Sequence, residues 1–328
     1  MVRAGGAGAQ AKAQRYHAQH ETDENPGQQQ EADDKHGHRI HRMTWLFRAL
    51  SRLPLPVLYV LGRGLGFLLF NVLNVRGGVV MDNLARSFPE RSKAERRQLW
   101  RAYHRQVMDV AMETIKGFTL PAEQLRERVV LEGFEPVLAE IAAGRSLMIV
   151  TAHHCNWEWL LLRLTEALPC PVDAIYKTLQ PAGVDEAFLA MRSRFGGRMV
   201  SAKEVLKRIL GRRENPRVIA LVADQVPLSA ANKIWLKFLG QDTAFFAGPE
   251  EISRALKLPV YFLAMERLEL GHYRVTAELL SRPGEGGEVP KETTRRYAQR
   301  LEAHLLAQPA DWFWGHRRWK LQKPLYGK

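Results

Sequence analysis

Residues 146–168, SLMIVTAHHCNWEWLLLRLTEAL, decide the fold. The apolar, β-branched run 147–151 predicts a short buried strand. The helical spacing of the apolar residues in 157–168 predicts a helix, and Asn156 is placed to cap it. His153 lies between the two elements, at the carboxyl end of the strand, where open α/β sheets bind their ligands.

An acidic residue follows His153 at a distance that suits a catalytic pair. Glu158 falls in the first turn of the predicted helix, five positions after His153. We expect its carboxylate to accept a hydrogen bond from one ring nitrogen and to leave the other nitrogen as a general base. A substrate hydroxyl would complete the triad. A histidine beside a strand is often only a structural residue, and the spacing alone leaves both interpretations open.

The composition limits the class of protein and the kind of partner. The chain has 328 residues, 46% apolar and 25% charged, which suits one large α/β domain or two small ones. Its net charge of +13 predicts an acidic partner: nucleic acid, an anionic membrane or an acidic carrier protein. Two cysteines, Cys155 and Cys170, form neither a disulfide framework nor a metal-binding pattern, which suits a reducing compartment.

The first 42 residues differ from the rest. They carry six Lys/Arg and six Asp/Glu, so the whole charge excess lies in 43–328. Their polar composition predicts a disordered tail, although five histidines leave a metal-binding tract as the alternative. We expect Met43 to be the natural start, with 1–42 as an over-extended reading frame or a dispensable tail.

Residues 43–75 predict an apolar helix that anchors the protein to a membrane or lies in its interface. The stretch 57–75 is apolar except for Arg63, Asn71 and Asn74, and it is almost long enough to span a bilayer. Arg63 would cost about 2.5–3.5 kcal/mol at the centre of a bilayer. The basic residues before the stretch favour the cytoplasmic side. A buried amphipathic helix of a soluble domain is the alternative.

The remaining pattern alternates strands and helices, which predicts an α/β fold with one mixed central sheet covered by helices. Asp224 and Gln225 end one of the strands, and Gly248 lies near the start of a helix expected at 245–256, a start that suits an oxyanion or another anion. Further strands are expected at 172–176, 218–223, 258–266 and 273–279, and helices at 93–118, 134–142, 185–194, 245–256 and 293–308.

Two basic segments have open interpretations. Arg192 and Arg194 end one predicted helix, where they would clamp phosphates or an acidic carrier, or form a solvated charged face. Near the end of the chain, 312–320 interleaves tryptophan with cationic residues. Such a segment would stack on nucleic-acid bases or lie at a membrane interface.

Six motifs in order resemble the bacterial lipid A biosynthesis acyltransferases, the late lauroyl/myristoyl acyltransferases of lipopolysaccharide assembly. The resemblance covers about 43–323 and departs from the family pattern at His154, Cys155 and Lys177. Cys155 stands where the family usually has a glycine. The motifs are His153–Glu158 (like H-x4-D/E, or HxGNWE), Asn83-Leu84 with Phe88-Pro89, Arg192–Arg194, Ala223-Asp224-Gln225, Phe238–Gly240 with Gly248-Pro249, and Trp314–Trp319 (like W-x-H-R-R-[FW]).

The resemblance implies a glycerolipid-acyltransferase-like fold, with 76–328 as the acyltransferase domain behind a membrane helix in 43–75. It implies acyl transfer from an acyl-carrier-protein thioester to a hydroxyl of a lipid A precursor, on the cytoplasmic face of the Gram-negative inner membrane. His153 would be the base, held by Glu158, without a covalent acyl-enzyme, a cofactor or a metal. The implied substrate-binding residues are Asn156, Arg192, Arg194, Asp224, Gln225 and Gly248, with the arginines on phosphates and Asp224 and Gln225 shaping the site.

Four alternatives stay open at this point. A lysophospholipid or an aminolipid would replace the lipid A precursor as acceptor. Cys155 would act as a nucleophile with His154. A metal-dependent membrane hydrolase would use His153, His154 and Glu158. A nucleic-acid-binding protein would use the aromatic, basic segment near the end of the chain.

Overall fold

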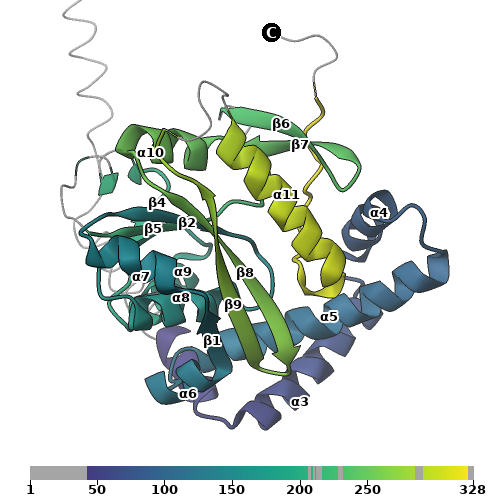
Figure 1. The fold of residues 1–328 in the computed structure, drawn as a ribbon. Helices are drawn as coiled ribbons and strands as arrows, with labels where there is room; N and C mark the ends of the chain where they lie inside the picture. Colours follow the sequence, from purple (N-terminus) through teal and green to yellow (C-terminus); the bar gives the residue numbers. More distant parts are fainter. Residues whose placement is uncertain are drawn as a thin grey trace, which may run out of the picture.

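The computed structural model describes residues 43–205, 208–209, 211, 216–227, 232–284 and 291–323, so the expectations for 1–42 lie outside it. A seven-stranded sheet with the order β1-β9-β8-β2-β5-β3-β4 forms its centre (Figure 1). Strands β8 and β9 are antiparallel, and all other neighbours are parallel. The prediction of a mixed α/β sheet is confirmed. The strands are β1 (Val129–Glu132), β2 (Leu147–Thr151), β3 (Val172–Tyr176), β4 (Arg198–Ser201), β5 (Val218–Val222), β8 (Val260–Glu269) and β9 (His272–Ser281).

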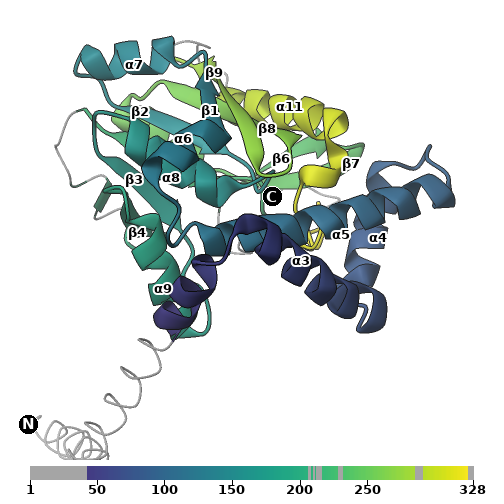
Figure 2. The same ribbon diagram turned by 90° about the horizontal axis from the view of Figure 1, so that it is seen from below.

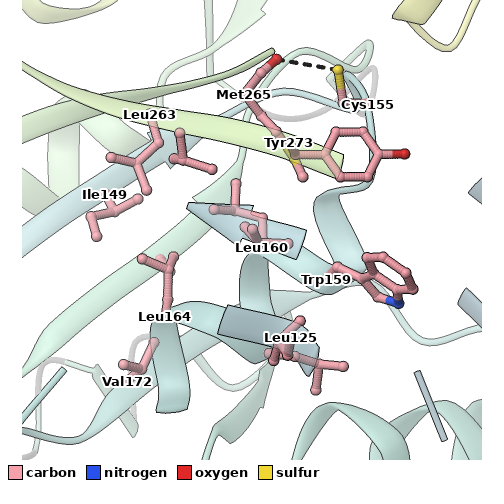
Figure 3. Packing of buried hydrophobic residues seen from close by; sticks show 14 of the residues in the cluster. Leu125, Ile149, Cys155, Trp159, Leu160, Leu164, Val172, Leu263, Met265 and Tyr273 are labelled. Carbon is pink, nitrogen blue, oxygen red and sulfur yellow. Dashed lines mark hydrogen bonds between the residues drawn. The ribbon is translucent and has the colours of Figure 1, made fainter. Parts of the chain in front are cut away.

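The sheet is covered on both faces, which explains why its central strands are apolar without interruption. In β2, Leu147 and Ile149 join one core cluster, whereas Met148 and Val150 join the other. The first cluster, part of which is drawn in Figure 3, lies under helices α3, α5, α6, α7 and α8. The second lies under α4, α11 and the hairpin β6–β7. These elements are α3 (Leu55–Gly66), α4 (Gly77–Ser87), α5 (Lys93–Lys116), α6 (Ala122–Arg128), α7 (Glu135–Ala142), α8 (Trp157–Ala167), α11 (Glu292–Ala307), β6 (Lys233–Phe238) and β7 (Gln241–Phe246).

The predicted elements lie where the structure has them, with ends shifted by at most three residues, except near residue 245. Helix α9 (Ala182–Arg192) begins three residues earlier than expected. The helix predicted for 245–256 begins only at Gly248, as α10 (Gly248–Leu256), because Phe245 pairs with Ile234 in the hairpin. Strands β1 and β4 and the hairpin were not predicted. These four strands, β1, β4 and the hairpin strands β6 and β7, are each at most six residues long, which leaves little pattern to recognise.

The predicted apolar helix exists, and one side of it packs against the domain. Helix α3 continues into a π-helical turn, η1 (Phe67–Val72), and together they give 18 residues that are long and apolar enough to span a membrane. The helix begins at Leu55, not at the N-terminus of the chain. It lies along α5 on the underside of the molecule (Figure 2). Only 28% of its residues are buried, whereas the core helix of a soluble domain would be mostly buried.

The exposed side of this helix and the residues just after it carry nine large apolar side chains, which we call the apolar face. It consists of Val57, Val60, Leu61, Leu65, Phe67, Leu68, Val72, Leu73 and Val75, all of which are at least 40% exposed. Arg63 is directed toward Asp109 of α5, with 3.6 Å between Nε and Oδ1. That pairing explains how an arginine is tolerated in an otherwise apolar stretch. Exposed apolar surface of this extent marks an interaction site.

Close contact between α3 and α5 depends on glycine. A Cβ atom on Gly62 would lie 2.5 Å from Met112 Cγ, whereas a Cβ on Gly64 would meet nothing within 4 Å. We therefore expect Gly62→Leu to lower the free energy of unfolding by about 1–3 kcal/mol through overpacking. The control Gly64→Leu should be neutral or slightly stabilising, since leucine favours helix more than glycine does. Denaturant unfolding in mild detergent measures both variants, and equal effects would contradict this packing.

Candidate active site

The register of the central sheet brings His153 to Asp224. Strands β2 and β5 are parallel neighbours, with Thr151 opposite Val222. His153 and Asp224 each lie two residues beyond that pair, so they emerge side by side at the carboxyl edge of the sheet. This edge is where α/β folds place their functional groups. His153 Nδ1 and Asp224 Oδ1 are 2.6 Å apart.

Asp224 is a buried carboxylate whose hydrogen bonds keep it ionised. Oδ2 accepts from the His153 backbone N at 3.0 Å and from Trp312 Nε1 at 2.7 Å. Burial alone would raise the pKa of Asp224, but the charge of His153 and these hydrogen bonds outweigh it and lower the pKa to about 2. An ionised Asp224 holds the proton of His153 on Nδ1. The geometry thus leaves the lone pair of Nε2 directed away from Asp224.

The second ring nitrogen faces a pocket. Gln225 Nε2 lies 3.2 Å from His153 Nε2, which fits an amide N–H donated to an unprotonated imidazole nitrogen. His153 and Gln225 both line a cavity of about 520 Å³. The His153 side chain is 21% exposed, so a substrate hydroxyl can replace Gln225 as its partner. The indole of Trp157 packs edge-on against the imidazole, with 5.0 Å between ring centroids, and fixes its plane.

The pocket suits a hydrocarbon chain in size and lining. It runs between α8, β3 and β5, and apolar side chains make up most of its wall. Its volume lies in the range of cavities that bind small ligands. Its lining includes Leu160, Leu161, Leu164, Ala174, Ile175, Met199 and Leu221.

Glu158 lines the same pocket but does not hold His153. Arg192 takes both of its oxygens, with Nε to Oε2 at 2.8 Å and Nη2 to Oε1 at 2.6 Å. The predicted hydrogen bond from His153 to Glu158 is therefore wrong, because Asp224 occupies Nδ1 and Arg192 occupies the carboxylate. Arg192 is itself part of the pocket wall. The pair is a bidentate, almost fully desolvated ion pair, which fixes both groups beside the imidazole.

Asn156 caps α8 as predicted but lies outside the pocket. Its Oδ1 accepts from Trp159 N at 2.9 Å, and its Nδ2 donates to Glu113 Oε2 at 2.8 Å. Glu113 is fully buried, and it also accepts from the hydroxyls of Tyr59 at 2.8 Å and Tyr273 at 2.5 Å. Asn156 thus holds the turn after His153 in place and has no free group for a substrate.

Arg194 and Gly248 do not join the site. Arg194 donates to the carbonyl oxygens of Gly117 and Leu120, where α5 ends, so its charge stabilises a helix terminus. Gly248 is absent from the pocket lining, and the first turn of its helix carries Glu250 and Glu251, which would repel an anion. Their predicted roles in substrate binding therefore gain no support from the geometry.

His154 and Cys155 are structural. The His154 ring lies between the carbonyls of Met265 and Gln308, and burial lowers its pKa to about 3. Cys155 donates its thiol to the carbonyl of Met265 (Figure 3), and burial raises its pKa well above the usual value. A thiol without a thiolate form is a poor nucleophile. Its φ of 52° lies in the left-handed region, which explains the glycine usual in the family pattern.

We call the His153–Asp224 pair the dyad. The metal-dependent and nucleic-acid-binding alternatives to it lack the geometry that they need. Within the ranges that the structure describes, no three His, Cys, Asp or Glu side chains are grouped to hold a metal ion. Trp312 and Trp314, which were expected to stack on bases or to lie at a membrane interface, are buried.

Residues 312–320, which we call the closing segment, form hydrogen bonds to both His153 and Asp224. Phe313 N donates to the His153 carbonyl at 3.0 Å, and Trp312 contacts Asp224 as described above. Sequence reasoning missed this role of Trp312, as it missed Asp224 as the partner of His153. The available signal was the position of Asp224 directly after a buried strand. An imidazole and a carboxylate beside an apolar pocket are an arrangement typical of enzymes that activate a hydroxyl next to a hydrocarbon chain.

Comparison with known proteins agrees with that class. Residues 37–321 match the family of bacterial lipid A biosynthesis acyltransferases, and the chain belongs to this family. The lipid A biosynthesis lauroyltransferase of Escherichia coli (strain K12) is 30% identical over 125 residues, 37% of this chain and 41% of the relative. The E. coli lipid A biosynthesis palmitoleoyltransferase is 23% identical over 280 residues, 84% of this chain and 88% of the relative.

Among solved structures, the 1-acyl-sn-glycerophosphate acyltransferase PlsC from Thermotoga maritima is similar to this chain with a TM-score of 0.35 and 15% identity. The match covers 76% of this chain and 98% of PlsC.

The lowered pKa of Asp224 makes the free energy of unfolding depend on pH in a predictable direction. A carboxyl whose pKa falls from 3.8 to about 2 on folding adds stability above about pH 4, and this contribution is lost as pH falls toward 2. We expect Asp224→Asn to destabilise the protein at neutral pH. The deficit should shrink by about 2 kcal/mol between about pH 5 and pH 2. Denaturant unfolding across this range tests it, and a deficit that stays constant would contradict the assignment.

Proposed function

We propose that the protein transfers a fatty acyl chain from an acyl-carrier-protein thioester to a hydroxyl of a lipid A precursor. The observation that carries the proposal is the His153–Asp224 pair, whose free Nε2 opens onto the apolar pocket. Membership of the lipid A acyltransferase family supports the reaction class and the acceptor. The basic excess of the chain suits an acidic carrier and an anionic membrane surface.

His153 supplies the proton transfer. Nε2 removes the proton of the acceptor hydroxyl as its oxygen attacks the thioester carbonyl, and Asp224 stabilises the imidazolium. The tetrahedral intermediate then collapses: a C–O bond has formed, the C–S bond breaks, and the imidazolium returns its proton to the departing thiolate. No covalent acyl-enzyme is needed, which fits the buried, un-ionised thiol of Cys155.

Arg192, held in place by Glu158, stabilises the negative charge that develops in this step. Nε and Nη2 of Arg192 bind Glu158, and the guanidinium is thereby fixed in the pocket wall near His153. A fixed guanidinium stabilises the oxyanion of the intermediate without reorganisation. Glu158 is then a positioning residue for Arg192, in place of its predicted role as partner of His153.

The apolar face of α3 and η1 brings the site to its lipid. A helix that buries one side in the domain and exposes the other to solvent suits the interfacial position better than a full span. We infer that the apolar face rests on the cytoplasmic leaflet of the inner membrane. Of the open acceptors, the lipid A precursor is favoured over a lysophospholipid or an aminolipid by the family match.

Lipid A mass spectrometry tests the reaction. A strain lacking this gene should lose one secondary acyl chain, and wild-type protein should restore it. His153→Ala should fail, because loss of the base lowers the rate by about 10²–10⁴-fold.

The matched control is Cys155→Gly, which keeps the left-handed backbone and removes the neighbouring thiol. We expect it to restore the chain. An acyl chain restored by His153→Ala, or lost only in Cys155→Gly, would overturn the mechanism.

A further inference from the structure

A second cavity lies away from the dyad, between α4 and the closing segment. It has a volume of about 460 Å³, and four cationic side chains line it against a single carboxylate, Asp82. We call it the basic hollow. The cations are Arg76, Arg86, Arg317 and Lys320.

Most of this positive charge is unneutralised. Arg86 pairs with Asp82 at 3.0 Å, and Arg76 Nη1 donates to the neutral carbonyl of Gly315 at 2.9 Å. Within the described ranges, Arg317 and Lys320 form no ion pair, and both are exposed. Such a concentration of cations in a concave site binds anions. The arginine fork matches a phosphate group in particular.

The residues first expected to bind phosphate are occupied elsewhere. Arg192 lies in the pocket of His153, where it binds Glu158 and is assigned to the oxyanion, and Arg194 donates to the carbonyls of Gly117 and Leu120. A phosphorylated acceptor therefore needs cations other than these two. The basic hollow supplies them in a cavity of a size that suits a lipid headgroup.

The closing segment connects the basic hollow to the dyad. Trp312 donates to Asp224, Phe313 donates to the carbonyl of His153, and Arg317 follows Trp312 by five residues. Five residues span at most about 17 Å. The Cα atoms of Trp312, beside Asp224, and of Arg317, in the wall of the basic hollow, are thus at most that far apart, a distance that a lipid headgroup with its attached chains can span.

The opposite side of the basic hollow adjoins the apolar face. Arg76 directly follows Val75, the last exposed apolar residue of that surface, and Gly77 and Gly78 begin α4 in the cavity wall. A molecule resting on a bilayer by its apolar face would hold the basic hollow at the level of the headgroups. Anionic groups of lipids lie at that level.

We propose that the basic hollow binds a phosphate monoester on the headgroup of the acceptor lipid. The proposal rests on the proposed function, since it assigns one part of the same acceptor to a second subsite. Binding there holds the headgroup while the hydroxyl reaches Nε2 of His153. The contact is a positioning interaction, so its loss affects acceptor binding more than the chemical step.

The test compares two double variants that remove the same charge. Arg317→Gln with Lys320→Gln changes the basic hollow, and Arg254→Gln with Lys257→Gln changes exposed cations at the carboxyl end of α10. Acyl transfer is measured in uncharged detergent micelles and in vesicles of anionic phospholipid, with the phosphorylated lipid A precursor and with the same precursor after its phosphates are removed. Binding of each precursor is measured separately by calorimetry without an acyl donor.

We expect the hollow variant to raise KM for the phosphorylated precursor at least about tenfold and to change kcat by less than about threefold. The control should behave as wild type. With the dephosphorylated precursor, wild type and both variants should share one raised KM. Equal losses with both precursors would overturn the proposal. So would a loss that appears only in vesicles of anionic phospholipid, which would mean a general membrane patch.

The calorimetric measurement distinguishes failure of the proposed acyl transfer from failure of the proposed phosphate site. If wild type transfers no acyl chain to either precursor, the proposed function fails. Binding of the phosphorylated precursor that weakens only in the hollow variant would still support the phosphate site. Equal binding by all three proteins would reject it.

Discussion

The hydrogen bond between His153 and Asp224 is the interaction on which the rest of the site depends. It requires β2 and β5 to be parallel neighbours in one register, since only then do two residues separated by 71 positions lie 2.6 Å apart. It also requires Asp224 to stay ionised while buried, which two N–H donors besides the imidazole ensure. One of those donors, Trp312, belongs to the closing segment, so this segment helps to keep Asp224 ionised.

The local parts of this arrangement could be predicted from the sequence. The strand 147–151, the cap by Asn156 and the helix after it follow from apolar periodicity and capping chemistry, which act over a few residues. The position of His153 at a strand end follows as well. The apolar helix was predicted from composition, and the structure adds that Gly62 and Arg63 attach one side of it to α5.

The pairing of the candidate catalytic groups could not be predicted in the same way. Glu158 was chosen because it is close in sequence, whereas Asp224 comes close only through strand order. Arg192 and Arg194 show the same limit. Both are cations at one helix end, yet one meets a carboxylate and the other two carbonyls, because packing against α8 and α5 decides their partners. Charge alone predicts an anion partner but not which cation is free to bind it.

Histidine ring NMR on ¹⁵N-labelled protein at about pH 8 is the most direct test of the account, since it reports which nitrogen of His153 carries the proton and what holds it there. The account predicts a protonated Nδ1 with a downfield proton and an unprotonated Nε2. Asp224→Asn should abolish this signature, and Glu158→Gln should leave it intact. A signature that survives Asp224→Asn and disappears in Glu158→Gln would contradict the central claim.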